Sequence, residues 1–140
     1  MVVTFDTETI RIIALFENLT NTTVKDCLID YDTNTVYFVV DEGKMGIAIG
    51  KNGSSIKNAE KIIGRNIKVF EFSKNLSTFV KNLIQKAEEV RIKGENDKVI
   101  VEVRVEKKFK SMIIGREGKR LKIFKEILER NHKVNDLIIR

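Results

Sequence analysis

The feature that most constrains this chain is an internal repeat of a short glycine pattern. Gly50-Lys51-Asn52-Gly53 and Gly115-Arg116-Glu117-Gly118 lie 65 residues apart, and an isoleucine, Ile49 or Ile114, precedes each copy. Apolar residues follow both copies at the i, i+3, i+7 spacing of one helix face, namely Ile56, Ala59 and Ile63 and then Leu121, Phe124 and Leu128. Each glycine pattern is therefore predicted to precede an amphipathic helix.

The segments around the two glycine patterns repeat as well. An apolar helix face opens each half, at residues 12–19 and again 64 residues later at 76–83. Two β-rich runs joined by a polar turn follow, and a third strand closes each half; the strands are expected at 24–31, 35–40 and 67–72 and at 89–93, 99–105 and 136–139, with turns at 32–34 and 94–97. This order predicts an α+β fold of two tandem domains, 1–73 and 74–140, each a three-stranded sheet covered by helices.

The charge is distributed unevenly along the 140 residues, whose net charge is +6. Residues 1–72 hold 8 basic and 10 acidic side chains, a net of −2, whereas residues 73–140 hold 18 and 10, a net of +8. Basic residues concentrate around the glycine patterns, at 44–68 and 107–133, and residues 1–43 hold 8 acidic groups against 2 basic ones. This distribution favours a polyanionic partner and makes the acidic segment a candidate docking face for a protein.

The glycine patterns are the candidate binding sites. Glycine lets another backbone come close, and the N–H groups and positive dipole end of the following helix favour a phosphate there. Apolar side chains before each pattern offer a surface for a base, as single-stranded nucleic acid requires. The candidate residues are Ile47, Ile49, Gly50, Lys51, Asn52, Gly53, Ser54 and Lys57 in the first half and Met112, Ile114, Gly115, Arg116, Glu117, Gly118, Lys119, Arg120 and Lys122 in the second. Arg65 and Arg130 match at the far ends of the two helices and could hold a polyanion along one side.

Other function classes find little support. Residues 46–52 have three residues between their glycines and an asparagine after the lysine, so they do not match a nucleotide-binding P-loop. With one cysteine, Cys27, and one histidine, His132, neither a disulfide, a cysteine-rich zinc site nor a Ser-His-Asp triad is expected. No metal, cofactor, catalytic residue or membrane span is predicted, and the cytoplasm is the expected location. Gly50 and Gly115 could also be simple helix C-caps in helix–helix turns.

Residues 48–56 and 113–121 resemble the apolar-Ile-Gly-x-x-Gly-x-x-apolar signature of the KH domain. Because the hairpin precedes the glycine loop, each half resembles the type II variant, and residues 40–53 within a tandem pair are similar to the archaeal NusA-like transcription factors. The resemblance implies binding of single-stranded RNA in transcription elongation or termination, and we expect both loops to bind one strand. Because no catalytic motif is found, we expect that the chain is not an enzyme. Transcription machinery is then the partner expected at the acidic segment. The alternative is a chaperone or assembly factor that binds ribosomal RNA. Glu117 departs from the usual pair of loop residues, because it brings a negative charge to the expected phosphate.

Overall fold

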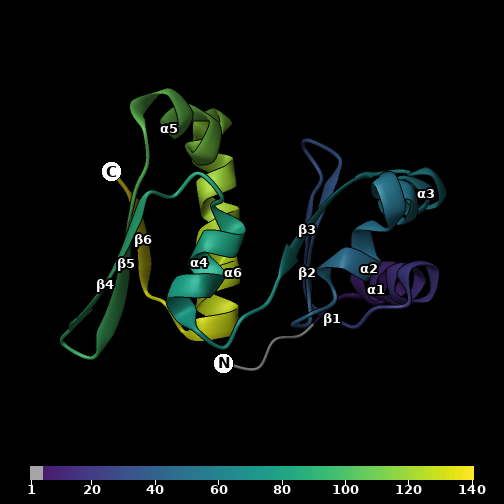
Figure 1. Cartoon of the computed structure of the whole chain (residues 1–140), viewed down its shortest axis with the longest axis horizontal. Helices are drawn as coiled ribbons and strands as arrows, with labels where there is room; N and C mark the ends of the chain where they lie inside the picture. Colours follow the sequence, from purple (N-terminus) through teal and green to yellow (C-terminus); the bar gives the residue numbers. More distant parts are fainter. Residues whose placement is uncertain (1–4) are drawn as a thin grey trace. The chain divides into compact units, whose positions relative to one another are not determined.

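The computed structural model describes residues 5–140, which separate into two compact units. The first unit ends at Ser73, and the second runs from Lys74 to Arg140. Each has the element order helix, strand, strand, helix, 3₁₀ turn, helix, strand, as the sequence predicted (Figure 1). No helix among residues 5–140 is long and apolar enough to cross a membrane.

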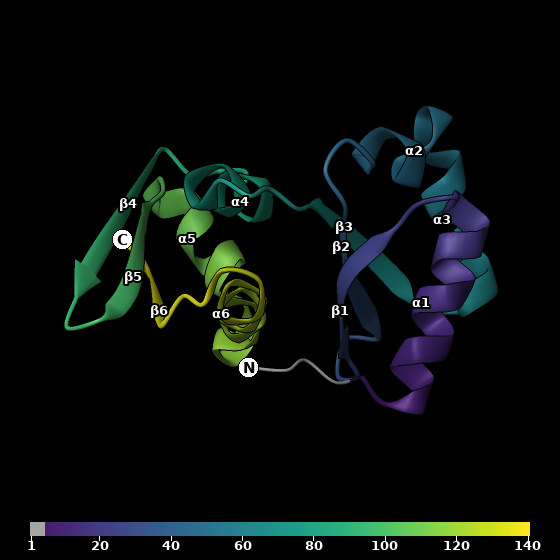
Figure 2. The same cartoon turned by 90° about the horizontal axis from the view of Figure 1, so that it is seen from below.

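In the first unit, three helices lie on one face of a three-stranded sheet (Figures 1 and 2). The elements are α1 (Thr7–Thr20), β1 (Val24–Asp30), β2 (Thr35–Val40), α2 (Met45–Ile49), η1 (Lys51–Gly53), α3 (Ser54–Ile63) and β3 (Asn66–Glu71). The central strand β2 is antiparallel to β1 and parallel to β3. A parallel pair needs a crossover connection, and α2 and α3 supply it. The glycine loop therefore lies inside this crossover.

The second unit repeats this topology. Its elements are α4 (Leu76–Leu83), β4 (Glu89–Glu95), β5 (Lys98–Arg104), α5 (Lys107–Ile114), η2 (Arg116–Gly118), α6 (Lys119–His132) and β6 (Asp136–Ile139). The central strand β5 is antiparallel to β4 and parallel to β6. Helices α4 and α6 cover one face of this sheet (Figure 1).

Phenylalanines on the predicted apolar helix faces are part of both cores. Phe16 of α1 is fully buried and stacks on Phe38 of β2 with ring centroids 3.9 Å apart. Phe79 of α4 and Phe124 of α6 are likewise buried in the second unit. Burying side chains of this size is worth roughly 2 to 3 kcal/mol each, so these rings hold the helices that carry the loops against their sheets.

The second hairpin differs from the prediction at its turn. The sequence predicted a turn over residues 94–97, but β4 continues to Glu95 and only Asn96 and Asp97 connect the strands. These two residues have φ of 51° and 63°, the conformation of a two-residue type I′ turn, which matches the twist of a hairpin. Gly94 lies within the strand, because two residues of this kind suffice to close the hairpin.

Candidate nucleic-acid interface

The two glycine loops adopt the same backbone despite their different central residues. Gly50 and Gly115 have φ, ψ of 75°, 172° and 77°, 173°, and Asn52 and Glu117 have 55°, 28° and 57°, 24°. In each loop the fourth residue donates its amide to the carbonyl of the first, at 3.1 Å and 3.2 Å. The loop shape is therefore a property of the glycine pattern and its flanking helices.

The first glycine of each pattern is required for two reasons. Gly50 has a backbone conformation that is essentially restricted to glycine, and a Cβ there would lie 2.8 Å from the amide nitrogen of Ser55. A Cβ on Gly115 would lie 2.6 Å from the Cβ of Arg120. The missing side chains let the preceding helix approach the first turn of the following one.

Gly50 and Gly115 also end their helices, as the alternative interpretation of these glycines suggested. The Gly50 amide donates to the Gly46 carbonyl at 2.9 Å, and the Gly115 amide donates to that of Ser111 at 2.9 Å. Helix termination and close approach are thus properties of the same residue. Both properties are compatible with ligand binding, because the start of the next helix follows at the other end of each loop, after Gly53 or Gly118.

The start of the helix after each loop has the features of an anion site. Gly53 and Gly118 are the N-cap residues of α3 and α6, and neither has a side chain that could cap the first turn. The amide groups at such a helix start favour a negatively charged ligand. Both helices begin where the sequence predicted, at Ser54 and Lys119.

Lysine side chains differ between the two loops. A Cβ built on Gly53 would lie 3.8 Å from the Cε of Lys57, so the Lys57 side chain folds back over the first loop. Nothing lies within 4 Å of the corresponding position on Gly118, so Lys122 does not cover the second loop in this way. Both lysines are exposed, and the first loop has a second exposed cation in Lys51.

Apolar side chains lie exposed next to both loops. Ile47 on α2 is 47% exposed and Met112 on α5 is 49% exposed, whereas Ile49 and Ile114, which end the same helices, are half-buried. An exposed side chain of this size at the same position in both units is a candidate surface for a nucleobase. The structure thus brings all four predicted apolar residues beside the loops.

Arg120 and the residues around it partly support the second loop. Its guanidinium donates to the Met112 carbonyl at 3.4 Å, and its side chain is half-buried against Gly115. Arg116 and Glu117 are exposed, and Lys119 is half-buried. The Arg120 side chain therefore also helps to hold the second loop against α5.

Two arginines named in the sequence analysis do not contribute to the interface as predicted. Arg65 bonds to Glu8 at 2.7 Å and its side chain is 19% exposed. Arg130 pairs with Glu126 at 3.5 Å and is 11% exposed. Both arginines are largely buried within their own units, so the prediction that they hold a polyanion along the helix is wrong.

The acidic residues of the segment 1–43 are used mostly within the first unit. Carboxylates of this segment accept hydrogen bonds there, including those of Asp6, Glu8, Glu17, Asp26, Asp30 and Asp41. Asp6, for example, caps α1 by accepting from the Thr9 amide at 2.8 Å, and this bond lowers the pKa of Asp6. Local structure therefore accounts for much of the acidity of this segment.

Sequence reasoning missed a group of charged residues on the second sheet. Glu89, Arg91, Lys93, Glu102, Arg104 and Arg140 line one cavity on this sheet. An alternating pattern was visible in the sequence, since Glu89, Arg91 and Lys93 are two residues apart and so share one face of a strand. Only the pairing of the strands brings them together with the other three. Within residues 5–140, no group of three or more His, Cys, Asp or Glu residues could hold a metal ion.

Comparisons with known proteins agree with this geometry. The KH domain family matches residues 10–84, from within α1 to the residue after α4. The chain is 37% identical over 123 residues to the probable transcription termination protein NusA of Methanococcus vannielii, covering 86% of this chain and 70% of that protein. It is 32% identical over 140 residues to the protein of the same name from Thermoplasma acidophilum, covering 99% and 96%. The crystal structure of APE1850 matches with a TM-score of 0.78 and 33% identity, over 97% of this chain and 100% of that one. The chain therefore belongs to the family of archaeal NusA-like KH-domain proteins.

Proposed function

We propose that this protein binds single-stranded RNA through its two glycine loops and acts in transcription elongation or termination. The observation that carries the proposal is the shared loop backbone, which presents the start of a helix, exposed cations and an exposed apolar side chain together in both units. KH domains clamp about four nucleotides of backbone at such a loop. The names of the relatives, probable transcription termination proteins, support the process.

Each loop is proposed to bind RNA in two ways. The Ser54 and Lys119 amides already donate to the carbonyls of Lys51 and Arg116, so a backbone phosphate accepts from the amides that follow them in the first turn of α3 or α6. Nearby lysines such as Lys51 and Lys57 add positive charge. A base then lies against the apolar side chains of α2 or α5, represented by Ile47 and Met112. Phosphate contacts of this kind carry no sequence information, so any preference for certain bases comes from the apolar side.

We further propose that the two units are type II KH domains with boundaries at 1–73 and 74–140. In both units the antiparallel hairpin precedes the glycine loop and the parallel strand follows it. This order supports the type II variant. The family match itself continues to residue 84, beyond the end of the first unit.

RNA binding is tested by fluorescence anisotropy with labelled RNA. Two loops that each clamp about four nucleotides predict that a single strand of about eight nucleotides binds better than a duplex of the same length. The affinity should fall steeply with salt, because neutralised phosphates release counterions. Equal affinity for both forms of RNA, or no response to salt, would contradict the proposal.

The cellular process and the absence of catalysis need separate experiments. Crosslinking and sequencing of bound RNA in the native cell should recover nascent transcripts, and recovery of mature ribosomal RNA alone would favour a role in ribosome assembly. Purified protein should hydrolyse neither ATP nor GTP above a buffer control, and turnover that is lost on mutation of Lys51 would refute the proposal of a pure binding protein. Contact between the acidic segment and transcription machinery stays a prediction.

A further inference from the structure

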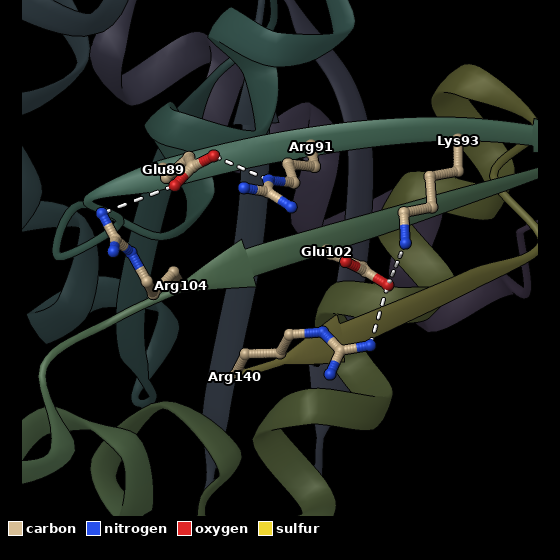
Figure 3. Close-up of a pocket in the computed structure, with 6 residues that line it drawn as sticks. All are labelled: Glu89, Arg91, Lys93, Glu102, Arg104 and Arg140. Carbon is tan, nitrogen blue, oxygen red and sulfur yellow. Dashed lines mark hydrogen bonds and ion pairs between the residues drawn. The ribbon is translucent and has the colours of Figure 1, made fainter.

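The second sheet has a charged face that the glycine loops do not use. Buried Val101 and Val103 alternate along β5 with Glu102 and Arg104, so these two charged residues point to the face opposite the helices. A cavity of about 320 Å³ lies on this face, lined by Glu89, Arg91, Lys93, Glu102, Arg104 and Arg140 (Figure 3). Four cations and two carboxylates give this lining a net charge of +2.

Each carboxylate in the cavity is held between two cations. Glu89 accepts from Nε of Arg91 at 2.7 Å and pairs with Nη2 of Arg104 at 3.4 Å. Glu102 accepts from Nζ of Lys93 at 3.1 Å and from Nη2 of Arg140 at 2.9 Å (Figure 3). Each negative charge is thus paired with two cations, so the net positive charge of the lining favours an incoming anion.

The cations keep donors for a ligand. The side chains of Arg91, Arg104 and Arg140 are 65%, 62% and 61% exposed, whereas that of Glu102 is only 9% exposed. In the ion pairs of this cavity, each guanidinium uses a single nitrogen among the described residues. Since a guanidinium has five N–H donors in a planar fork, each arginine can still bind one edge of a phosphate.

The first unit provides an internal comparison for this face. At the repeat offset of 65 residues, Tyr37 and Val39 of β2 stand where Glu102 and Arg104 stand in β5. Tyr37 stacks on Phe70 of β3 with ring centroids 6.3 Å apart, and this face of the first sheet also carries Asp26 and Lys68. The fold therefore does not require charge at the positions of Glu102 and Arg104, and the group of three arginines on this face belongs to the second unit.

We propose that this cationic face binds backbone phosphates of an RNA strand that extends beyond the second glycine loop, an inference that rests on the proposed function. The face is continuous in sequence with the helix that leads to that loop, because Arg104 ends β5 and α5 begins at Lys107. Exposed Lys107 and Lys108 lie at this junction, where Lys108 pairs with exposed Glu106 at 3.5 Å. Two lysines against one carboxylate leave the junction between the cavity and the loop with a net positive charge. This continuity favours RNA over an acidic peptide, which the same cations could otherwise bind.

The test compares a short and a long single-stranded RNA, oligouridylates of about 8 and about 24 nucleotides, the shorter sufficient for two loops of about four nucleotides each. The variant is Arg91→Gln with Arg104→Gln, whose lost ion pairs involve only the half-exposed Glu89. The control is Lys81→Gln with Lys98→Gln, two exposed lysines of the same unit that give the same change in charge. Circular dichroism checks that each protein is folded.

We expect the arginine variant to lose affinity for the long RNA only. The arginine variant should bind the 24-nucleotide strand about tenfold more weakly at low salt. The slope of the logarithm of its binding constant against the logarithm of the salt concentration should be smaller in magnitude by about 1.4, because two phosphate contacts are lost. It should bind the 8-nucleotide strand like the wild type. A third variant, Arg91→Lys with Arg104→Lys, should keep most of the salt slope, because it keeps both charges.

Other outcomes separate this inference from the proposed function. If the variant Arg91→Gln with Arg104→Gln and the control Lys81→Gln with Lys98→Gln bind the long strand equally, the inference is wrong even though the loops bind RNA. If the wild type binds only the long strand and the arginine variant loses it, the cationic face is supported and the loop proposal fails. If an oligoglutamate peptide binds and the arginine variant loses that binding while its RNA affinity is unchanged, the face is a protein-docking site and the inference is overturned.

Discussion

Reversing the charge of the first glycine loop should weaken RNA binding strongly without unfolding the protein. The change is Lys51→Asp with Asn52→Asp, at two exposed positions. Asn52 has φ of 55°, a left-handed conformation that aspartate tolerates almost as well as asparagine. Gly50 and Gly53 stay in place, so the backbone that presents the start of α3 should be preserved.

The size of the effect follows from the charge change at the phosphate. Replacing lysine with aspartate lowers the charge of the loop by two units, and replacing asparagine with aspartate lowers it by one more. Two unit charges about 4 Å apart in water interact with about 1 kcal/mol, so three units give about 3 kcal/mol at low salt, or roughly a 100-fold loss of affinity. Screening with a length of about 8 Å at physiological ionic strength should reduce this loss.

The assay is a fluorescence anisotropy titration of one labelled single-stranded RNA with the wild type and with the loop variant, at several salt concentrations. The matched control is Asn58→Asp with Lys61→Asp, which places the same charge change on exposed residues of α3, the helix that follows the loop. The control should lose much less affinity, because it adds charge away from the proposed phosphate. If the loop variant is folded and binds within twofold of the control, the first loop is not a phosphate site.

Three further predictions follow from the second unit. Glu117→Lys should raise RNA affinity at low salt by a few tenths to about 1 kcal/mol, because it replaces a negative charge near a helix N-terminus with a positive one. The affinity of Glu117→Gln should lie between those of the wild type and Glu117→Lys. If Glu117→Lys binds RNA more weakly than the wild type, the second loop is not a phosphate site. Gly115→Ala should lower the free energy of unfolding more than Gly118→Ala. A Cβ at position 115 would clash with Arg120, whereas a Cβ at position 118 would meet nothing within 4 Å, so only the left-handed φ costs about 1 to 2 kcal/mol there. Equal decreases in the free energy of unfolding, measured by chemical denaturation, would contradict this prediction. Hydrogen bonds from Arg140 and then from Lys93 lower the pKa of Glu102. At pH values above the unfolded pKa of about 4.3, the Glu102 carboxylate therefore stabilises the fold, and this contribution is lost as the pH falls through the lower folded pKa. Arg140→Gln should raise the pKa of Glu102 in a ¹³C NMR titration, and an unchanged pKa would show that the ion pair is absent in solution.

Much of the fold was predictable because its signals are local. The spacing of apolar residues such as Phe16 and Phe79 predicts amphipathic helices, and the β-rich runs predict hairpins within one or two residues of the observed strands. Because the repeat predicts each element in both halves, the glycine pattern, which is weak evidence for a fold in one copy, is specific evidence in two. The position of the loop before α3 and before α6 follows from the same local pattern.

The conformations of single loop residues could not be predicted in this way. Asn52 favours a left-handed backbone, whereas Glu117 does not, yet both have φ near 56°. The packing of the helices on either side imposes this conformation, since the helix that follows Gly115 approaches so closely that no Cβ fits. The left-handed backbone of Glu117 is therefore a consequence of how the two helices pack.

The partners of the charged residues were decided by the tertiary structure alone. The sequence match between Arg65 and Arg130 predicts a ligand for a polyanion, but folding brings Arg65 to Glu8, 57 residues away. The cationic face arises because the register of β4 and β5 sets Glu89 opposite Arg104 and Arg91 opposite Glu102. Periodicity places a side chain on one face of its own element, but which charges meet across elements depends on strand register and helix packing, which the chain acquires only when it folds.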